Sequence, residues 1–305
     1  MNLAQALGYS PGERLLIVNA DDYGMCHSAN AGIQQLLAEG AISSTTIMMP
    51  CPWAKEAAEW AAARPNVDVG IHLTFTSEWD TYRWGPVTRR QTVLSLITEE
   101  GYFPRDCRTV ETKARAAEIY AEMTGQIRLA RRMGLTPTHL DNHMGSLYGL
   151  ETGRDFISLV LSICAGNGFP FRLPRHIPAS LPLPSAARRI HKARVREADS
   201  LGVVIPDYLI QLPFSLRPGE TYESFRESMA AALCSLQSGV SELYIHPAVI
   251  TDELMAIHHE WLKRGMELQI FRDPWIREVM RSQRIRQISW RSLQQLQLRR
   301  RRRDP

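Results

Sequence analysis

Two adjacent carboxylates, Asp21 and Asp22, follow an apolar run at residues 15–18 and come shortly before Gly24. The run indicates a buried strand, because strands of parallel sheets covered on both faces are apolar throughout. Charges at the end of such a strand are costly unless a metal ion, a partner group or water receives them. Ligands and catalytic groups gather at that end of parallel strands. The pair therefore indicates metal binding or acid–base chemistry.

Histidines stand at or near the ends of three further candidate strands. His72 lies in the apolar segment 69–74, His246 ends the segment 243–246, and the segment after Pro137 carries His139, Asp141 and His143. One carboxylate and two imidazoles are a normal ligand set for a catalytic divalent ion. Taken singly, a buried histidine is more often a hydrogen-bonded core residue, and an Asp-Asp pair after a strand is as often a helix cap or a turn. Convergence of all four segments on one mouth of a barrel favours the chemical interpretation.

The two carboxylates have separate roles only if both face the same pocket. Neighbouring residues of a strand point to opposite faces. A turn at the strand end is therefore required, and Gly24 makes such a turn feasible. One carboxylate would then bind the ion and the other would remain available as a base.

Short apolar runs alternate with helical patterns along the chain. The strands are expected at 15–19, 44–49, 67–75, 138–141, 171–173, 208–211 and 242–245. The helices are expected at 29–39, 53–64, 114–133, 155–165, 186–200 and 222–237, with Ser28 as the cap of the first and a long loop at 76–90. About seven parallel strands with intervening helices predict an α/β fold, a complete or incomplete (β/α) barrel. We expect one domain at 1–285, then a C-terminal helix and a basic, disordered tail at 286–305.

Composition excludes several classes of protein. The net charge of +4 comes from the five arginines at 299–303, without which it would be near −1, so the basic balance is weak evidence for nucleic acid. The five cysteines show no C-x-x-C spacing, which argues against a disulfide scaffold and a cysteine zinc site. Neither a signal peptide nor an apolar stretch of about 18 residues is evident. A cytoplasmic protein is the expectation.

Four motifs in register resemble the YdjC-like carbohydrate deacetylases, a family that includes chitooligosaccharide deacetylases. The resemblance spans about residues 14–281, and its motifs are NADDYG at 19–24, VGIHLT at 69–74, THLDNH at 138–143 and IHP at 245–247. It implies a deformed barrel, one divalent metal ion and hydrolysis of an N-acetyl group of an amino sugar. Either magnesium or zinc is consistent with the donor types.

The resemblance also assigns roles. It implies that Asp22, His72 and a histidine of the third motif bind the metal, and that Asp21 is the base. We predict His143 as that histidine, with His139 as the second choice. Many members continue this motif with a later histidine where the chain has Gly145, which predicts a subgroup with a different substrate.

A general acid is also needed, because an amine leaves poorly unless protonated. We predict His246, since an imidazole can hold a proton near neutral pH. Trp79, Tyr82 and Trp84 are predicted to stack against sugar rings, with packing against the barrel rim as the alternative. Arg172 is predicted to bind a polar substrate group, or else to pair with a carboxylate.

The expected partner is a small N-acetylated saccharide. We expect no binding to nucleic acid or to a membrane, and a homodimer is a further possibility. Two other functions remain. One is another metal-dependent barrel hydrolase or an isomerase acting on a small polar metabolite. The other is a non-catalytic carbohydrate-binding protein, against which Asp21 and His246 argue, because a binder needs neither a base nor an acid.

Overall fold

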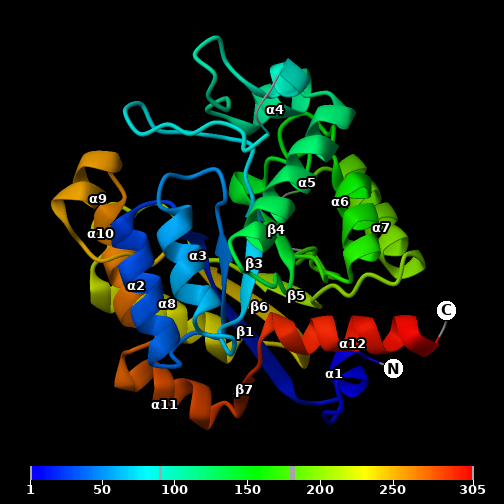
Figure 1. Cartoon of the computed structure of the whole chain (residues 1–305). Coiled ribbons are helices and arrows are strands. Elements are labelled where there is room, and N and C mark those ends of the chain that lie inside the picture. The colour runs from blue at the N-terminus through cyan, green and yellow to red at the C-terminus, as the bar shows by residue number, and fades with distance from the viewer. Residues whose placement is uncertain (1, 89–90, 179–182, 304–305) are drawn as a thin grey trace.

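A parallel sheet forms the centre of the computed structural model, which describes residues 2–88, 91–178 and 183–303 (Figure 1). Its strands run in the order β4-β3-β2-β1-β6-β5, and β7 pairs with the first half of β1. The bounds are β1 Arg14–Tyr23, β2 Ser44–Ile47, β3 Val69–Leu73, β4 Leu140–Asn142, β5 Tyr208–Ile210, β6 Gly239–Ile245 and β7 Ile285–Gln287.

Irregular chain continues the sheet beyond β4. Phe171 forms an isolated parallel bridge with Leu140, and its N–H donates to the carbonyl of Val204 at 3.1 Å. Farther along, the Asp207 N–H donates to the carbonyl of Val240 in β6 at 2.9 Å. These bonds lead from β4 round towards β6, which confirms the expected incomplete α/β barrel.

Helices surround the sheet (Figure 1). They are α1 Leu3–Ala6, α2 His27–Ala38, α3 Ala54–Ala62, α4 Cys107–Lys113, α5 Ala116–Arg132, α6 Ile157–Asn167, α7 Ser185–Ser200, α8 Tyr222–Cys234, α9 Asp252–Ile257, α10 Trp261–Ile270, α11 Pro274–Ser282 and α12 Trp290–Arg303, with short 3-10 helices η1 Gln91–Leu96 and η2 His143–Gly145. Within the described ranges, none of these helices has the length and apolar character needed to cross a membrane.

The element order follows the sequence prediction, with instructive differences. Elements α1, α4 and β7 were not predicted from the sequence pattern, and the strand expected at 171–173 is only the bridge at Phe171. The expected Ser28 cap was wrong, because Cys26 occupies the N-cap position of α2. The loop expected at 76–90 has neither helix nor strand over its described part, 76–88. Residues 89 and 90 of that prediction lie outside the described residues.

The arginine-rich end is helical up to Arg303, whereas its composition favoured a disordered tail. Residues 304 and 305 of that prediction lie outside the described residues, and the division into 1–285 and 286–305 stays a prediction. Helix α12 runs across the lower right of Figure 1, below β4 and β5, and packs on a second, smaller apolar cluster that includes Leu15, Val240, Trp290 and Leu293. The last helix therefore covers one end of the barrel.

Candidate active site

An irregular end of β1 brings both carboxylates to the same place. The pairing of β1 with β2 shifts register between Ala20 and Tyr23, and Asp22 has a φ of 66°. A left-handed residue breaks the strand alternation, and Asp is one of the few side chains that tolerate it. Gly24, with a φ of 87°, completes the turn. The turn that the sequence requires is thus present, but it begins at Asp22 itself.

Asp22, His72 and His143 form a buried cluster. Asp22 Oδ1 lies 3.5 Å from His72 Nε2 and 3.3 Å from His143 Nδ1. The three donor atoms lie within 4.8 Å of one another. Asp22 Oδ1 is buried without a hydrogen bond, while Oδ2 accepts from Arg264 Nη2 at 2.7 Å. Burial raises the pKa of Asp22, but Arg264, His143 and His246 together outweigh it and hold the pKa well below its usual value, so this carboxylate is charged.

Each histidine of the cluster has a carboxylate on its other ring nitrogen. Asp141 Oδ1 lies 2.7 Å from His72 Nδ1, and Glu78 Oε2 lies 3.1 Å from His143 Nε2. Such partners fix the ring orientation and the tautomer of metal-binding histidines. Both rings are therefore held with one nitrogen facing Asp22.

His139 lies away from this cluster. It is completely buried, and its ring stacks on Trp290 with centroids 4.5 Å apart and an interplanar angle of 8°. Its Nδ1 lies 2.9 Å from the hydroxyl of Thr138. Burial and then Arg172 hold the pKa of His139 well below its usual value, so the ring is neutral. The structure therefore brings the first-choice histidine, His143, to Asp22 and not the second.

Asp21 is held by a guanidinium beside the cluster. Arg172 Nη1 donates to Asp21 Oδ2 at 2.6 Å, and Nη2 donates to Oδ1 at 2.7 Å. Nη2 also lies 2.9 Å from Asp141 Oδ2 and 2.9 Å from Glu242 Oε1. Burial raises the pKa of Asp21, but Arg172 overcomes it and lowers the pKa to about 2. Of the two roles open for Arg172, the structure shows carboxylate pairing.

His246 directly follows β6 and is close enough to both carboxylates to interact with them electrostatically. Its Nδ1 lies 3.7 Å from Glu267 Oε2, which also accepts the His246 backbone N–H at 2.6 Å. Burial lowers the pKa of His246, but Glu267 and Asp22 outweigh it, so the pKa lies above its usual value. Phe214, 40% exposed, stands edge-on to the imidazole with centroids 4.9 Å apart.

The three aromatic residues of the loop after β3 are placed differently from one another. Trp79 and Tyr82 are half-buried, and Trp79 stacks on His258 with centroids 4.9 Å apart. The Tyr82 hydroxyl donates to the carbonyl of Met25 at 2.6 Å, directly after the Asp22 turn. Trp84 is only 2% exposed, and its Nε1 donates to the carbonyl of Thr76 at 2.8 Å. Trp84 thus packs inside the rim, whereas Trp79 retains an accessible part.

Sequence reasoning missed Glu78, Glu242, Phe214, Arg264 and Glu267. Glu242 had a usable signal: Glu242 and Tyr244 in β6, and His246 directly after it, alternate with apolar residues, and residues two apart in a strand share a face. Arg264 and Glu267 belong to α10, far in sequence from the strand motifs, and only the fold brings them near.

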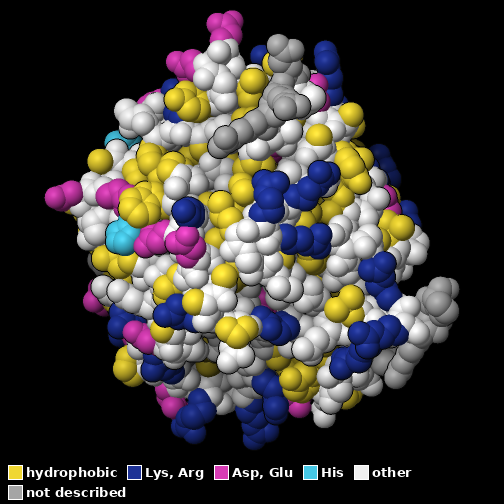
Figure 2. Space-filling view, in the orientation of Figure 1, with side chains coloured by type: hydrophobic (Ala, Val, Ile, Leu, Met, Phe, Trp, Pro, Cys, Tyr) yellow, Lys and Arg dark blue, Asp and Glu magenta, His cyan; other side chains and the backbone are white. Residues whose placement is uncertain are grey.

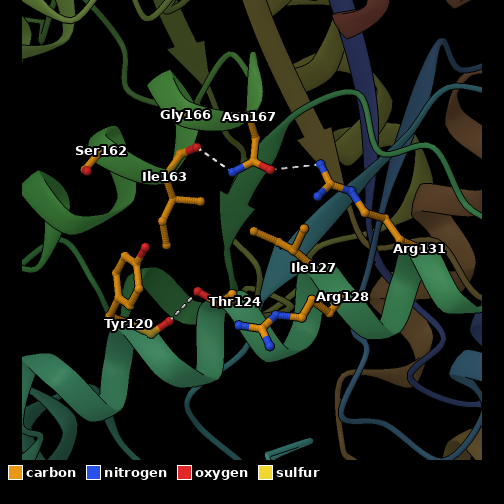
Figure 3. Close-up of a pocket in the computed structure, with 9 residues that line it drawn as sticks. All are labelled: Tyr120, Thr124, Ile127, Arg128, Arg131, Ser162, Ile163, Gly166 and Asn167. Atoms are coloured by element: carbon orange, nitrogen blue, oxygen red, sulfur yellow. Dashed lines mark hydrogen bonds between the residues drawn. The ribbon is translucent and has the colours of Figure 1, made fainter.

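A separate surface hollow lies between α5 and α6 (Figure 3) and contains none of the predicted site residues. Arg131 and Asn167 approach each other there, with Nη2 donating to Oδ1 at 2.9 Å. Figure 2 shows Lys and Arg side chains gathered on this face of the molecule. The hollow is therefore an outer feature of the helical layer and does not contribute to the buried cluster.

Comparisons with known proteins show which family the chain resembles over most of its length. The carbohydrate deacetylase of Thermoanaerobacter pseudethanolicus is 28% identical over 89% of this chain and 96% of its own length. The chitooligosaccharide deacetylase of Yersinia enterocolitica is 29% identical over 87% of this chain and 94% of its own. The crystal structure of a putative cellobiose-phosphate cleavage protein from Enterococcus faecalis matches with a TM-score of 0.73 and 26% identity, covering 92% of this chain and 99% of that one. The family model described as YdjC-like protein matches residues 15–282, and the chain therefore belongs to the YdjC-like family.

Proposed function

We propose that the protein is a metal-dependent hydrolase that removes the acetyl group from an N-acetylated amino sugar and releases acetate. The carrying observation is the buried Asp22, His72 and His143 cluster, with Asp21 on one side and His246 near the same carboxylates. The names of the relatives from Thermoanaerobacter pseudethanolicus and Yersinia enterocolitica support a carbohydrate substrate and a deacetylation reaction.

The donor set fits a divalent ion. Asp22 Oδ1, His72 Nε2 and His143 Nδ1 are the atoms that would hold it, and the first of these is buried with no hydrogen bond to satisfy it. Two imidazoles and one carboxylate suit zinc, while further water ligands would complete a magnesium site. When bound, the ion would lower the pKa of a water molecule and polarise the acetamide carbonyl.

Asp21 is proposed as the base that takes a proton from the attacking water. Because Arg172 lowers its pKa to about 2, Asp21 is ionised at every pH at which the protein would work. A base of such low pKa is weak, so it is effective only towards an acidified water within hydrogen-bond reach. The bidentate pair with Arg172 orients the carboxylate for that contact.

His246 is proposed as the acid that protonates the leaving amine. Its raised pKa, maintained against burial by Glu267 and Asp22, keeps the imidazole protonated to a higher pH than that of a free histidine. Phe214 and Trp79 flank this side of the site and offer apolar faces for a sugar ring. Gly145, where many family members have histidine, supports a substrate that differs from a chitooligosaccharide.

The test is acetate release from a panel of N-acetylated mono- and oligosaccharides, with zinc or magnesium restored to the metal-free protein. Asp21→Asn should retain metal and lower kcat by about 10²- to 10⁴-fold, because the general base is lost. Asp22→Ala and His72→Ala should lose the metal. Full activity in Asp21→Asn would refute the base assignment. Sugar binding without turnover would indicate a carbohydrate-binding protein, and turnover without acetate would indicate another hydrolase or an isomerase.

A further inference from the structure

The first residue of α12, Trp290, is completely buried beneath the barrel interior. Its Nε1 donates to Glu242 Oε1 at 3.0 Å, and its ring stacks on His139. The next backbone N–H, that of Arg291, donates to Asp68 Oδ2 at 2.6 Å. The indole is therefore fixed at its ring face, at its nitrogen and through its backbone.

Glu242 joins this indole to the proposed base. Glu242 Oε1 accepts from Trp290 and also from Arg172 Nη2 at 2.9 Å, while Glu242 Oε2 has no hydrogen-bond partner. Arg172 in turn holds both oxygens of Asp21. All four side chains are buried, so no solvent competes with these contacts.

We propose that Trp290 is a positioning residue for Asp21, acting through Glu242 and the Arg172 guanidinium. The proposal rests on the proposed function, because it takes Asp21 as the base. The family model ends at residue 282, so this support comes from a part of the chain beyond the matched region. The last helix then both covers one end of the barrel and orients a group at the other.

The physical reason is the sharing of one guanidinium among Asp21, Asp141 and Glu242. Burial raises the pKa of Glu242 to about 7 although Arg172 opposes it, and an N–H donated to the carboxylate favours its charged form. Loss of that N–H favours neutral Glu242, which holds Arg172 less firmly. The charged or titratable groups facing Glu242 are Arg172, Asp141, Asp21 and Tyr244.

Trp290→Phe removes the indole N–H and keeps an aromatic ring against His139. We expect kcat for acetate release to fall most, about 10-fold, near pH 7.5, where Glu242 is charged mainly when the indole N–H is in place, and less at pH 6 and at pH 8.5. KM and metal affinity should change less than about 2-fold, because Trp290 contacts neither substrate nor ligands.

Leu293→Ala is the matched control. Leu293 lies in the same helix, is completely buried and belongs to the same apolar cluster, but has no polar link to Glu242. It should lower the unfolding temperature and leave kcat and its pH profile unchanged. An equal loss of kcat in Leu293→Ala and Trp290→Phe would overturn the proposal, since helix packing alone would then account for it.

A double variant separates this pathway from a general defect. With Glu242→Gln already present, Trp290→Phe should lower kcat no further, because residues that act through one another are not additive. The same fold-loss in both backgrounds would overturn the proposal.

A signal that needs no substrate separates this proposal from the proposed function. The ¹⁵N–¹H resonance of the Trp290 indole, assigned by its absence in Trp290→Phe, should move in Glu242→Gln and in Asp21→Asn. An unmoved signal in Asp21→Asn would overturn the positioning role. If no sugar releases acetate, the proposed function fails, and this signal still decides whether Trp290 and Asp21 are linked.

Discussion

Two histidines that flank β4 show how position along one short segment decides chemistry. His139 and His143 flank β4 at odd positions and so share a face, about 13 Å apart at 3.3 Å per residue. We call the cluster of Asp22, His72 and His143 the mouth, and the contact of His139 with Trp290 the floor. At the mouth the ring lies between two carboxylates, whereas at the floor it stacks on an indole.

Opposite protonation follows from these surroundings. Burial lowers the pKa of both rings, but Glu78 and Asp22 overcome it at His143 and raise its pKa to about 10. At His139 nothing overcomes it, and the pKa stays well below its usual value. The difference teaches that a buried histidine stays neutral where burial and a nearby guanidinium prevail, and becomes a cation where two carboxylates face its ring nitrogens.

Exchange of each histidine for alanine is the strongest test of this comparison. His143→Ala should lose detectable metal binding in calorimetry, because one of three donors is gone. His139→Ala should bind metal normally and lose about 2–4 kcal/mol of unfolding free energy, because a buried ring is replaced by a cavity. Metal loss in His139→Ala with retention in His143→Ala would reverse the assignment of mouth and floor.

Glu78 offers a smaller effect at the mouth. Glu78→Ala should weaken metal binding about 10- to 100-fold, because His143 loses the partner that fixes its ring. Glu78→Gln should recover part of the affinity, since its amide oxygen still accepts from Nε2. Asp80→Ala, an exposed change in the same loop, is the control and should bind metal as the unaltered protein does. Equal weakening by Asp80→Ala would show a loop effect only.

The floor should give the smallest effect, seen only in acid. The pKa of His139 in the folded protein lies below its unfolded value, so the unfolded state binds more protons as the pH falls below about 6.5. Neutral, buried His139 therefore contributes fully to the free energy of unfolding above that pH. Below it, this contribution falls by about 1.4 kcal/mol per pH unit. His139→Phe should flatten this slope in urea titrations from pH 8 to pH 5. An unchanged slope would mean that the ring is not neutral when folded.

Sequence alone predicted the strand ends better than it predicted the connections between them. Asp22, His72 and His143 were accessible because apolar strands make polar residues at their ends conspicuous. The assignment of roles to these residues stays a prediction until metal and product are measured. Glu78 was not accessible in this way, because its loop has no periodic pattern to place it.

Two features escaped prediction because long-range contacts decide them. Strand β7 has three residues, too few for a periodic signal, and is defined by pairing with β1. The exposed arginine-rich stretch continues a helix that Leu293 and Leu296 anchor in the second apolar cluster. In β7 a tertiary contact thus overrides weak local preference, whereas the arginines, which have high helix propensity, extend a helix anchored elsewhere.

The pairing of β1 also bears on how the chain folds. This first strand lies between β2 on one side and β6 on the other, and β7 pairs with its first three residues, 14–16. Contacts between segments so distant in sequence form late and slow the search for the native state. During synthesis, most of β1 has no partner strand until residues 239–245 have been made. The contact of His139 with Trp290 can form only after residue 290 has been added. Newly made chains therefore expose an unpaired apolar edge, which is the stage at which a chaperone or aggregation would act.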